Sequence, residues 1–124
     1  MCPFCDQSAL QKRILHETPQ LLLVEDLYPV NKGHALIIPR RHIIDLFAMN
    51  EDEWSDLPMM IAAAKTLLDK AYNPDGYNIG ANCGSAAGQT VFHMHIHVIP
   101  RYKDDVKEPR GGVRNIKKPL VAYR

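Results

Sequence analysis

Three histidines, His93, His95 and His97, alternate along the segment 92–100, and the residues between and after them are apolar. Alternation with a period of two predicts a half-buried β-strand that carries all three imidazoles on one face. Neighbouring side chains on one face stand about 6.6–7 Å apart, so a single metal ion could take at most two adjacent imidazoles. A row of three instead favours different roles for the three side chains: one nucleophile, and two groups that bind, orient or protonate the substrate. We therefore interpret the segment as part of an active site.

The loop 84–90 leads directly into this row and is rich in small residues. It lacks the lysine of a Walker A motif, so it is not a P-loop. Small residues allow backbone N–H groups to come close to an anion, and Gln89 and Thr90 add side-chain donors. A plain connector is the simpler alternative, but the position of the loop favours phosphate binding.

A pair of thiols, Cys2 and Cys5, stands near the start of the sequence. Such a pair can chelate zinc, form a redox couple or have no role. A thioredoxin-like couple needs a preceding strand, for which the sequence leaves no room. Zinc takes four ligands, and His42 and His93 are candidates for the other two. The odd total of three cysteines argues against a disulfide framework and for a reducing compartment, so we expect a cytoplasmic protein.

The composition predicts one ordinary globular domain. The chain has 124 residues, of which 46% are apolar and 23% charged. No apolar run approaches the roughly 20 residues of a membrane span, so we expect no membrane partner. Residues 1–100 carry 7 basic and 11 acidic side chains, a net charge of −4, which does not fit a nucleic-acid-binding surface. Residues 101–124 carry 8 and 3, a net charge of +5, and this basic tail is either solvated or helps to hold an anionic substrate.

Short apolar runs predict the strands that must position the histidine row. Buried strands are expected at 20–26 and 34–39, on either side of the turn-rich segment 28–33, and they should form an antiparallel hairpin. A further strand is expected at 77–82, and a weak helix at 6–15.

A long amphipathic helix is predicted in the middle of the chain. The Asn-x-x-Glu pattern of residues 50–53 is typical of a helix N-terminus. Pro58 conflicts with an uninterrupted helix from that point. We therefore place the main helix from about Asp56 to Tyr72, after a short preceding turn, with Pro58 in its first turn. Its buried stripe recurs at three- and four-residue spacing and comprises Trp54, Leu57, Ile61, Ala64, Leu68 and Ala71.

The histidine row, with Gly88-Gln89-Thr90 just before it, resembles the histidine triad (HIT) superfamily of nucleotide hydrolases and transferases. Further landmarks of the resemblance lie in order over residues 2–101: the Cys-x-x-Cys pair, Asp26, the segments 32–34 and 38–42, and Asn82. The tail motif 109–114 is similar to bacterial and archaeal members described as diadenosine tetraphosphate hydrolases.

The resemblance implies an α+β fold with an antiparallel sheet of about five strands, one long helix and a shorter one. It implies a HIT domain over residues 1–101, followed by the basic tail 102–124, which would pack on the domain or on a partner chain. It also implies a homodimer.

The resemblance further implies chemistry at the α-phosphate of an adenine nucleotide, either a dinucleoside polyphosphate or a nucleoside phosphoramidate. His95 would be the nucleophile and form a covalent nucleotidyl-histidine, with a backbone carbonyl fixing its tautomer. A structural zinc would be held by Cys2, Cys5, His42 and His93. Other residues would flank the substrate: His97 and Thr90 at the phosphate or leaving group, Gln89 at the phosphate, Asn82 and His34 in support, Asp26 at the ribose, and Leu27 at the base.

Two alternatives remain open at this point. A metal-dependent phosphohydrolase would use the histidine row as metal ligands. A nucleotide-binding regulatory protein would keep the pocket with negligible turnover.

Overall fold

The computed structural model describes residues 2–116, so the basic cluster at 117–118 of the predicted tail lies outside the described residues. In chain order the elements are α1 (Gln7–Gln11), β1 (Ile14–Glu17), β2 (Leu21–Glu25), β3 (Ala35–Pro39), η1 (Leu46–Ala48), α2 (Glu51–Tyr72), β4 (Gly76–Gly80), η2 (Ser85–Ala87), β5 (Ile96–Arg101) and η3 (Gly112–Arg114).

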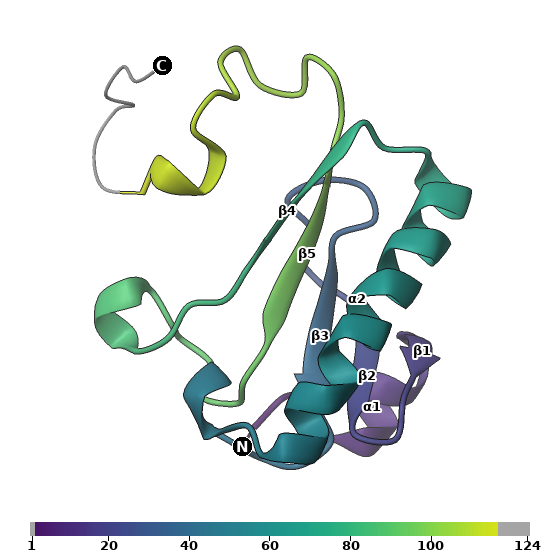
Figure 1. Ribbon diagram of the computed structural model, residues 1–124, viewed down its shortest axis with the longest axis vertical. Coiled ribbons are helices and arrows are strands. Elements are labelled where there is room, and N and C mark those ends of the chain that lie inside the picture. Colours follow the sequence, from purple (N-terminus) through teal and green to yellow (C-terminus); the bar gives the residue numbers. More distant parts are fainter. Residues whose placement is uncertain (1, 117–124) are drawn as a thin grey trace.

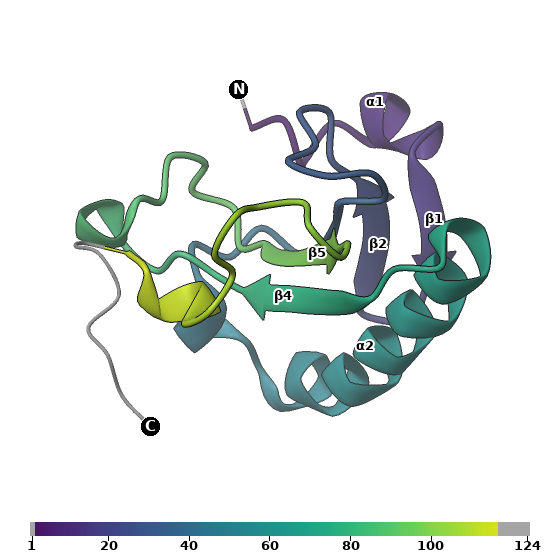
Figure 2. The ribbon, with the colours of Figure 1, turned by 90° about the horizontal axis from the view of Figure 1, so that it is seen from above.

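The five strands form one antiparallel sheet in the order β1-β2-β3-β5-β4. The helix α2 runs along one face of it (Figure 1). The short helix α1 and the N-terminal segment lie on the other side of the sheet, as the view from above shows (Figure 2). The expected α+β fold, with five antiparallel strands, one long helix and one short helix, is confirmed.

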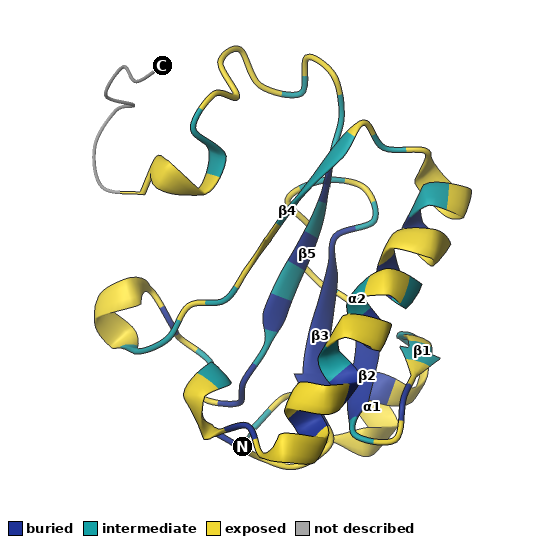
Figure 3. Ribbon diagram, in the orientation of Figure 1, coloured by how far each residue is buried: buried dark blue, intermediate teal, exposed yellow. Residues whose placement is uncertain are grey.

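Strands β2 and β3 are buried along almost their whole length (Figure 3) because both faces of the sheet are covered there. Their alternate residues enter two apolar clusters. The first cluster lies against α2 and includes Leu23, Ile37 and Met60. The second lies on the opposite face and joins Leu22 and Leu36 to the N-terminal elements. Burial on both faces explains why these strands are continuous apolar runs rather than alternating ones.

The helix α2 is a single helix from Glu51 to Tyr72, so the predicted start near Asp56 is wrong. Asn50 caps it: its side chain accepts from the Glu53 N–H, and the Glu53 carboxylate accepts from the Asn50 N–H. Pro58 removes one helical hydrogen bond, but it lies at an exposed position where water can bond the freed carbonyl.

The buried stripe of α2 is only partly the predicted one. Leu57, Ile61, Ala64 and Leu68 pack on the core, whereas Trp54 and Ala71 are exposed. Their place is taken by Glu53, Asp56 and Met60. The two carboxylates are buried because each has a partner: Glu53 bonds the Arg41 guanidinium at 2.7 Å, and Asp56 accepts from the Gln20 N–H at 2.7 Å.

The strand of the histidine row begins at Ile96, not at residue 92, so only His97 lies within it. Before it, the Met94 N–H donates to the Ile43 carbonyl instead of to a neighbouring strand. The alternation nevertheless persists: Met94, Ile96 and Val98 enter the cluster against α2. On the opposite side the His95 ring lies 5.2 Å from the His97 ring, and the Phe4 ring contacts both His93 and His95. Two smaller corrections concern the neighbouring elements: β4 spans Gly76–Gly80, and residues 14–17 form strand β1, which pairs with β2.

The described part of the tail packs on its own chain. The Arg101 guanidinium forms two hydrogen bonds to Asp105, whose carboxylate also accepts from Asn31. The Tyr102 hydroxyl donates to the Lys32 carbonyl. Within residues 2–116, no helix is long and apolar enough to cross a membrane.

Candidate active site

Neighbouring strand ends bring three polar residues together on the sheet face that lies opposite α2. His97 pairs across the sheet with Leu36, which belongs to the core cluster of that face. His34 stands two residues before Leu36, and Asp26 stands two residues after Val24, the β2 partner of Leu36, so both share the face. The His34 Nε2 atom lies 2.9 Å from the His97 Nδ1 atom and 3.3 Å from an Asp26 oxygen.

His95 stands beside this group, with its ring 5.2 Å from the ring of His97. Its Nδ1 atom lies 2.9 Å from the carbonyl oxygen of His93, which can only accept, so Nδ1 carries the proton. The other nitrogen, Nε2, then keeps its lone pair and has no hydrogen-bond partner among the described residues. The backbone carbonyl expected to fix the tautomer is therefore that of His93.

A cavity of about 220 Å³ opens in front of His95 and His97. Asp26 and Leu27, to which the family resemblance assigns the ribose and the base, both line it. Its other walls come from residues that sequence reasoning missed: Pro3, Phe4, Arg13, Tyr28, Leu36 and Val91. Phe4 could have been predicted from the sequence. It lies between the two thiols of the Cys-x-x-Cys pair, so a zinc site shared with His93 would bring it close to the histidine row. The sequence held no comparable signal for Arg13.

A second cavity of about 380 Å³ lies beside His97 and His34. Asn82, two residues after β4, lines it together with Ile79 of that strand. The tail residues Val113 and Ile116 complete it. His97 is thus shared by two cavities, whereas His95 faces the first one alone.

Gln89 and Thr90 are placed differently from the prediction. The Gln89 side chain is buried and donates to the carbonyls of Ile44 and Val91, while its backbone N–H donates to the Gly84 carbonyl. All three of its N–H bonds are therefore used to hold the loop. Thr90 is exposed and lines a hollow beside Cys2 and His42 rather than the cavity of His95.

Burial lowers the pKa of His93, and it does the same for the two imidazoles His34 and His97. Desolvation lowers the pKa of His97, and the neighbouring His95 and His34 lower it further, against the opposing charge of Asp26. Desolvation also lowers the pKa of His34, again opposed by Asp26. Both rings are therefore uncharged at neutral pH.

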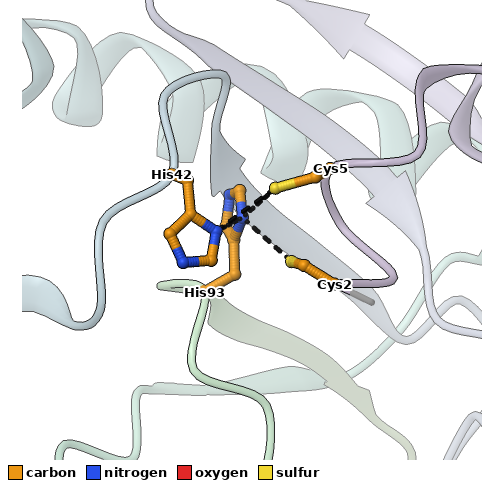
Figure 4. Close-up of side chains that lie close together, drawn as sticks. All are labelled: Cys2, Cys5, His42 and His93. Carbon is orange, nitrogen blue, oxygen red and sulfur yellow. Dashed lines mark hydrogen bonds between the residues drawn. The ribbon is translucent and has the colours of Figure 1, made fainter.

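The N-terminal thiols meet two histidines in a compact group (Figure 4), and the four possible ligand atoms all lie within 4.8 Å of one another. The Nδ1 atom of His93 is 3.4 Å from both sulfur atoms and 3.1 Å from the His42 Nδ1 atom, which is itself 3.2 Å from the Cys5 sulfur. Tetrahedral zinc with such ligands spaces them at about 3.3–3.8 Å. The Nε2 atom of His93 lies 3.0 Å from the Pro39 carbonyl, which leaves the lone pair on Nδ1 facing the group. Both the donor set and the spacing fit zinc.

Comparison with known proteins gives a consistent result. A model of the HIT domain matches residues 7–104. A HIT-like protein of Methanocaldococcus jannaschii is 35% identical over 119 residues, covering 94% of this chain and 92% of the relative. The bis(5'-nucleosyl)-tetraphosphatase (asymmetrical) of Schizosaccharomyces pombe is 33% identical over 96 residues, covering 77% of this chain and 53% of the relative. The crystal structure of a zinc-bound histidine triad family protein from Mycobacterium smegmatis matches with a TM-score of 0.71 at 33% identity, covering 84% of this chain and 77% of that one.

Proposed function

Because the chain belongs to the HIT domain family, we propose that it hydrolyses nucleotides, or transfers their nucleotidyl group, by attack of His95 on the α-phosphate. The observation that carries this proposal is the pinned tautomer of His95. Its Nδ1–H is held by the His93 carbonyl, which leaves Nε2 unprotonated, and its side chain lines a cavity together with Asp26 and Leu27. The relatives named as dinucleoside polyphosphate hydrolases support the same substrate class.

In the first step the Nε2 lone pair forms a bond to the α-phosphorus, and the bond from phosphorus to the leaving group breaks. The His95 ring becomes a nucleotidyl-imidazolium whose Nδ1–H stays bonded to the His93 carbonyl. In the second step water attacks phosphorus and loses a proton to the solvent, and the P–N bond breaks to give a nucleoside monophosphate and free, neutral His95. The positive imidazolium is a good leaving group, so the two steps replace one difficult displacement.

The walls of the cavity divide the remaining tasks. His97 lines both cavities. It would donate to the phosphate or to the departing group. The carboxylate of Asp26 can accept the ribose hydroxyls, although one of its oxygens also accepts from the Tyr28 N–H. Leu27 would contact the base, and Asn82 would support the leaving-group side. The roles predicted for Gln89 and Thr90 require the loop 84–90 to rearrange.

We also propose that Cys2, Cys5, His42 and His93 hold a structural zinc. The metal would clamp the N-terminal segment to His93 and would have no open position for substrate. A zinc at this place is compatible with the proposed attack by His95. The ring of His93 would bind the metal, while the backbone carbonyl of His93 accepts the hydrogen bond of the His95 Nδ1–H.

The nucleophile is tested by His95→Asn, with diadenosine tetraphosphate and adenosine 5'-phosphoramidate as substrates. We expect kcat to fall by at least about a thousandfold, since asparagine cannot form the covalent intermediate and both chemical steps depend on that intermediate. Binding of adenosine monophosphate should stay close to that of the wild type. Rapid-quench mass spectrometry of the wild type should find one nucleoside monophosphate attached to His95.

The matched control is His16→Asn, because His16 is a histidine of strand β1 outside both cavities. It should keep wild-type turnover. Activity of His95→Asn within about tenfold of the wild type would refute the nucleophile assignment.

A further inference from the structure

One charged side chain in the wall of the first cavity has no task in the chemistry proposed above. The half-buried Arg13 lines the cavity of about 220 Å³ together with Asp26, His95 and His97. The two histidines would face the phosphate, and Asp26 would face the ribose. The guanidinium of Arg13 is therefore left for another part of the ligand.

Arg13 is held in this wall by its backbone and by its side chain. The backbone N–H donates to the Leu10 carbonyl at 2.8 Å, and the backbone carbonyl accepts from the Glu25 N–H at 3.0 Å. The Nη1 atom of the guanidinium donates to the Glu25 carbonyl at 2.8 Å. A guanidinium carries five N–H groups, so most of them remain available for a ligand.

The guanidinium of Arg13 has no carboxylate partner among residues 2–116. Arg40, Arg41 and Arg101 each bond a carboxylate oxygen at 2.7 or 2.8 Å, whereas the bond of Arg13 goes to a backbone carbonyl. A planar guanidinium beside a cavity is suited to bind two neighbouring acceptor atoms at once. The partner that Arg13 lacks in the protein can therefore come from the ligand.

The strand order shows which part of a nucleotide would reach Arg13. His97 lies on β5, and β3 separates this strand from β2. The Nη1 bond ties the guanidinium to Glu25, the last residue of β2, so two strand spacings of about 4.8 Å lie between the backbone that holds it and that of His97. Asp26 follows Glu25 directly. A nucleotide with its phosphate at the histidines and its ribose at Asp26 would therefore turn its base toward Arg13.

The chemistry of the guanidinium distinguishes between the two purines because it can only donate hydrogen bonds. Guanine offers the neighbouring acceptors O6 and N7, which an arginine binds in a bidentate manner, whereas adenine has a donating amino group in place of O6. The other residues at this end do not oppose the choice. Phe4 and Leu27 are apolar and can pack on either base, and Tyr28 is 86% exposed, so water can bond its hydroxyl.

We propose that Arg13 is a specificity-determining residue that makes the protein prefer nucleotides of 6-oxopurines, guanine or hypoxanthine, over those of adenine. The adenine implied by the family resemblance would place its amino group against the N–H groups of Arg13. The inference rests on the proposed function, because the position of the base follows from a phosphate bound at His95 and His97.

The test is the equilibrium binding of the monophosphates of guanosine, inosine and adenosine to the zinc-loaded protein, measured by titration calorimetry. Guanosine and inosine monophosphate should bind about tenfold more tightly than adenosine monophosphate, at the lower end for a bidentate arginine contact because Arg13 is only half-buried. Inosine monophosphate has O6 and N7 but lacks the amino group of guanine, so it isolates the proposed contact.

Three variants assign the preference to the guanidinium. Arg13→Leu should abolish it, chiefly by weakening the binding of the two 6-oxopurine nucleotides. Arg13→Lys keeps the charge but loses the planar pair of donors, so it should retain only part of the preference. Lys12→Leu is the matched control, because it removes an exposed positive charge one residue away that lines neither cavity, and it should leave the preference unchanged.

Equal affinity of the wild type for all three nucleotides would overturn the inference, and that measurement decides even if Arg13→Leu does not fold. Equal weakening of all three in a folded Arg13→Leu protein would place the guanidinium at the phosphate and would overturn it as well. Turnover of guanosine and adenosine 5'-phosphoramidate separates this inference from the proposed function. If the binding preference is found but neither compound is hydrolysed, the base contact stands and the proposed function fails. If both are hydrolysed with equal kcat/KM and bound equally, the function stands and the base contact fails.

Discussion

His93 connects the proposed zinc site to the proposed nucleophile. Its ring lies among Cys2, Cys5 and His42, its Nε2 atom is near the Pro39 carbonyl, and its own carbonyl holds His95. The position of His93, which the cysteine cluster helps to fix, therefore also fixes the carbonyl that orients the proposed nucleophile. The alternating pattern of the sequence makes the three histidines look equivalent, but each has a different neighbourhood.

The zinc proposal predicts that Cys5→Ser removes the metal and lowers stability far more than it changes the chemical step. Metal analysis should fall from about one zinc per chain to almost none. The melting temperature should fall by about 10 °C or more, since loss of a few kcal/mol lowers it by that amount in a domain of this size. Cys83→Ser is the matched control, because this thiol lies outside the cluster. Purified wild-type protein without zinc would contradict the proposal.

The lowered pKa values of His34 and His97 predict a loss of stability as the pH falls. In the unfolded chain histidine has its ordinary pKa of about 6.5, above the folded values, so the unfolded chain binds more protons in this range. The free energy of unfolding should therefore decrease from pH 7 to pH 5.5, a window in which ordinary carboxylates stay ionised. Urea titrations measure it. His34→Gln removes one of the groups with a lowered pKa and should make the decrease shallower. An equal slope in the variant would argue against this account.

At the scale of elements, the sequence predicted what depends on local pattern. The apolar runs of β2 and β3 were visible in it, and so was the Asn50–Glu53 cap, although Pro58 moved the predicted start of α2 to Asp56. Strand β1 was missed because Ile14–Glu17 is half exposed and is defined by its pairing with β2. The site shows the same division: Asp26, Leu27, His95 and His97 do share a cavity, but the partner of the Gln89 side chain, the Ile44 carbonyl, lies 45 residues away.

The capping box of α2 gives a prediction at this scale. Asn50→Ala removes the acceptor of the Glu53 N–H and should lower the free energy of unfolding by about 1 kcal/mol, which a urea titration would detect. Asn50→Asp keeps an acceptor at the same place and should remain close to the wild type. Equal stability of the two variants would show that the cap contributes little to the domain.

For the whole molecule, the described chain leaves apolar side chains uncovered next to the face of α2 that packs on the sheet. Met59 is 54% exposed and Leu67 is 37% exposed, two turns apart on one side of the helix. Strand β4 also stands at the edge of the sheet, where its outer backbone groups have no strand partner among the described residues. A second copy of the chain could cover both features. The homodimer implied by the family resemblance stays a prediction, and we expect its interface at this side of α2 and at β4.

This prediction is tested by placing a charge at the uncovered side of α2. If two copies meet there, burying an unpaired carboxylate is costly, so Leu67→Glu should weaken the dimer and leave the folded monomer intact. Sedimentation velocity at micromolar concentration should show a dimer for the wild type and a shift toward monomer for the variant. Gln11→Glu adds the same charge on α1, an exposed position away from this surface, and should leave the dimer unchanged. A monomeric wild type would refute the dimer, and an undisturbed dimer in Leu67→Glu would move the interface elsewhere.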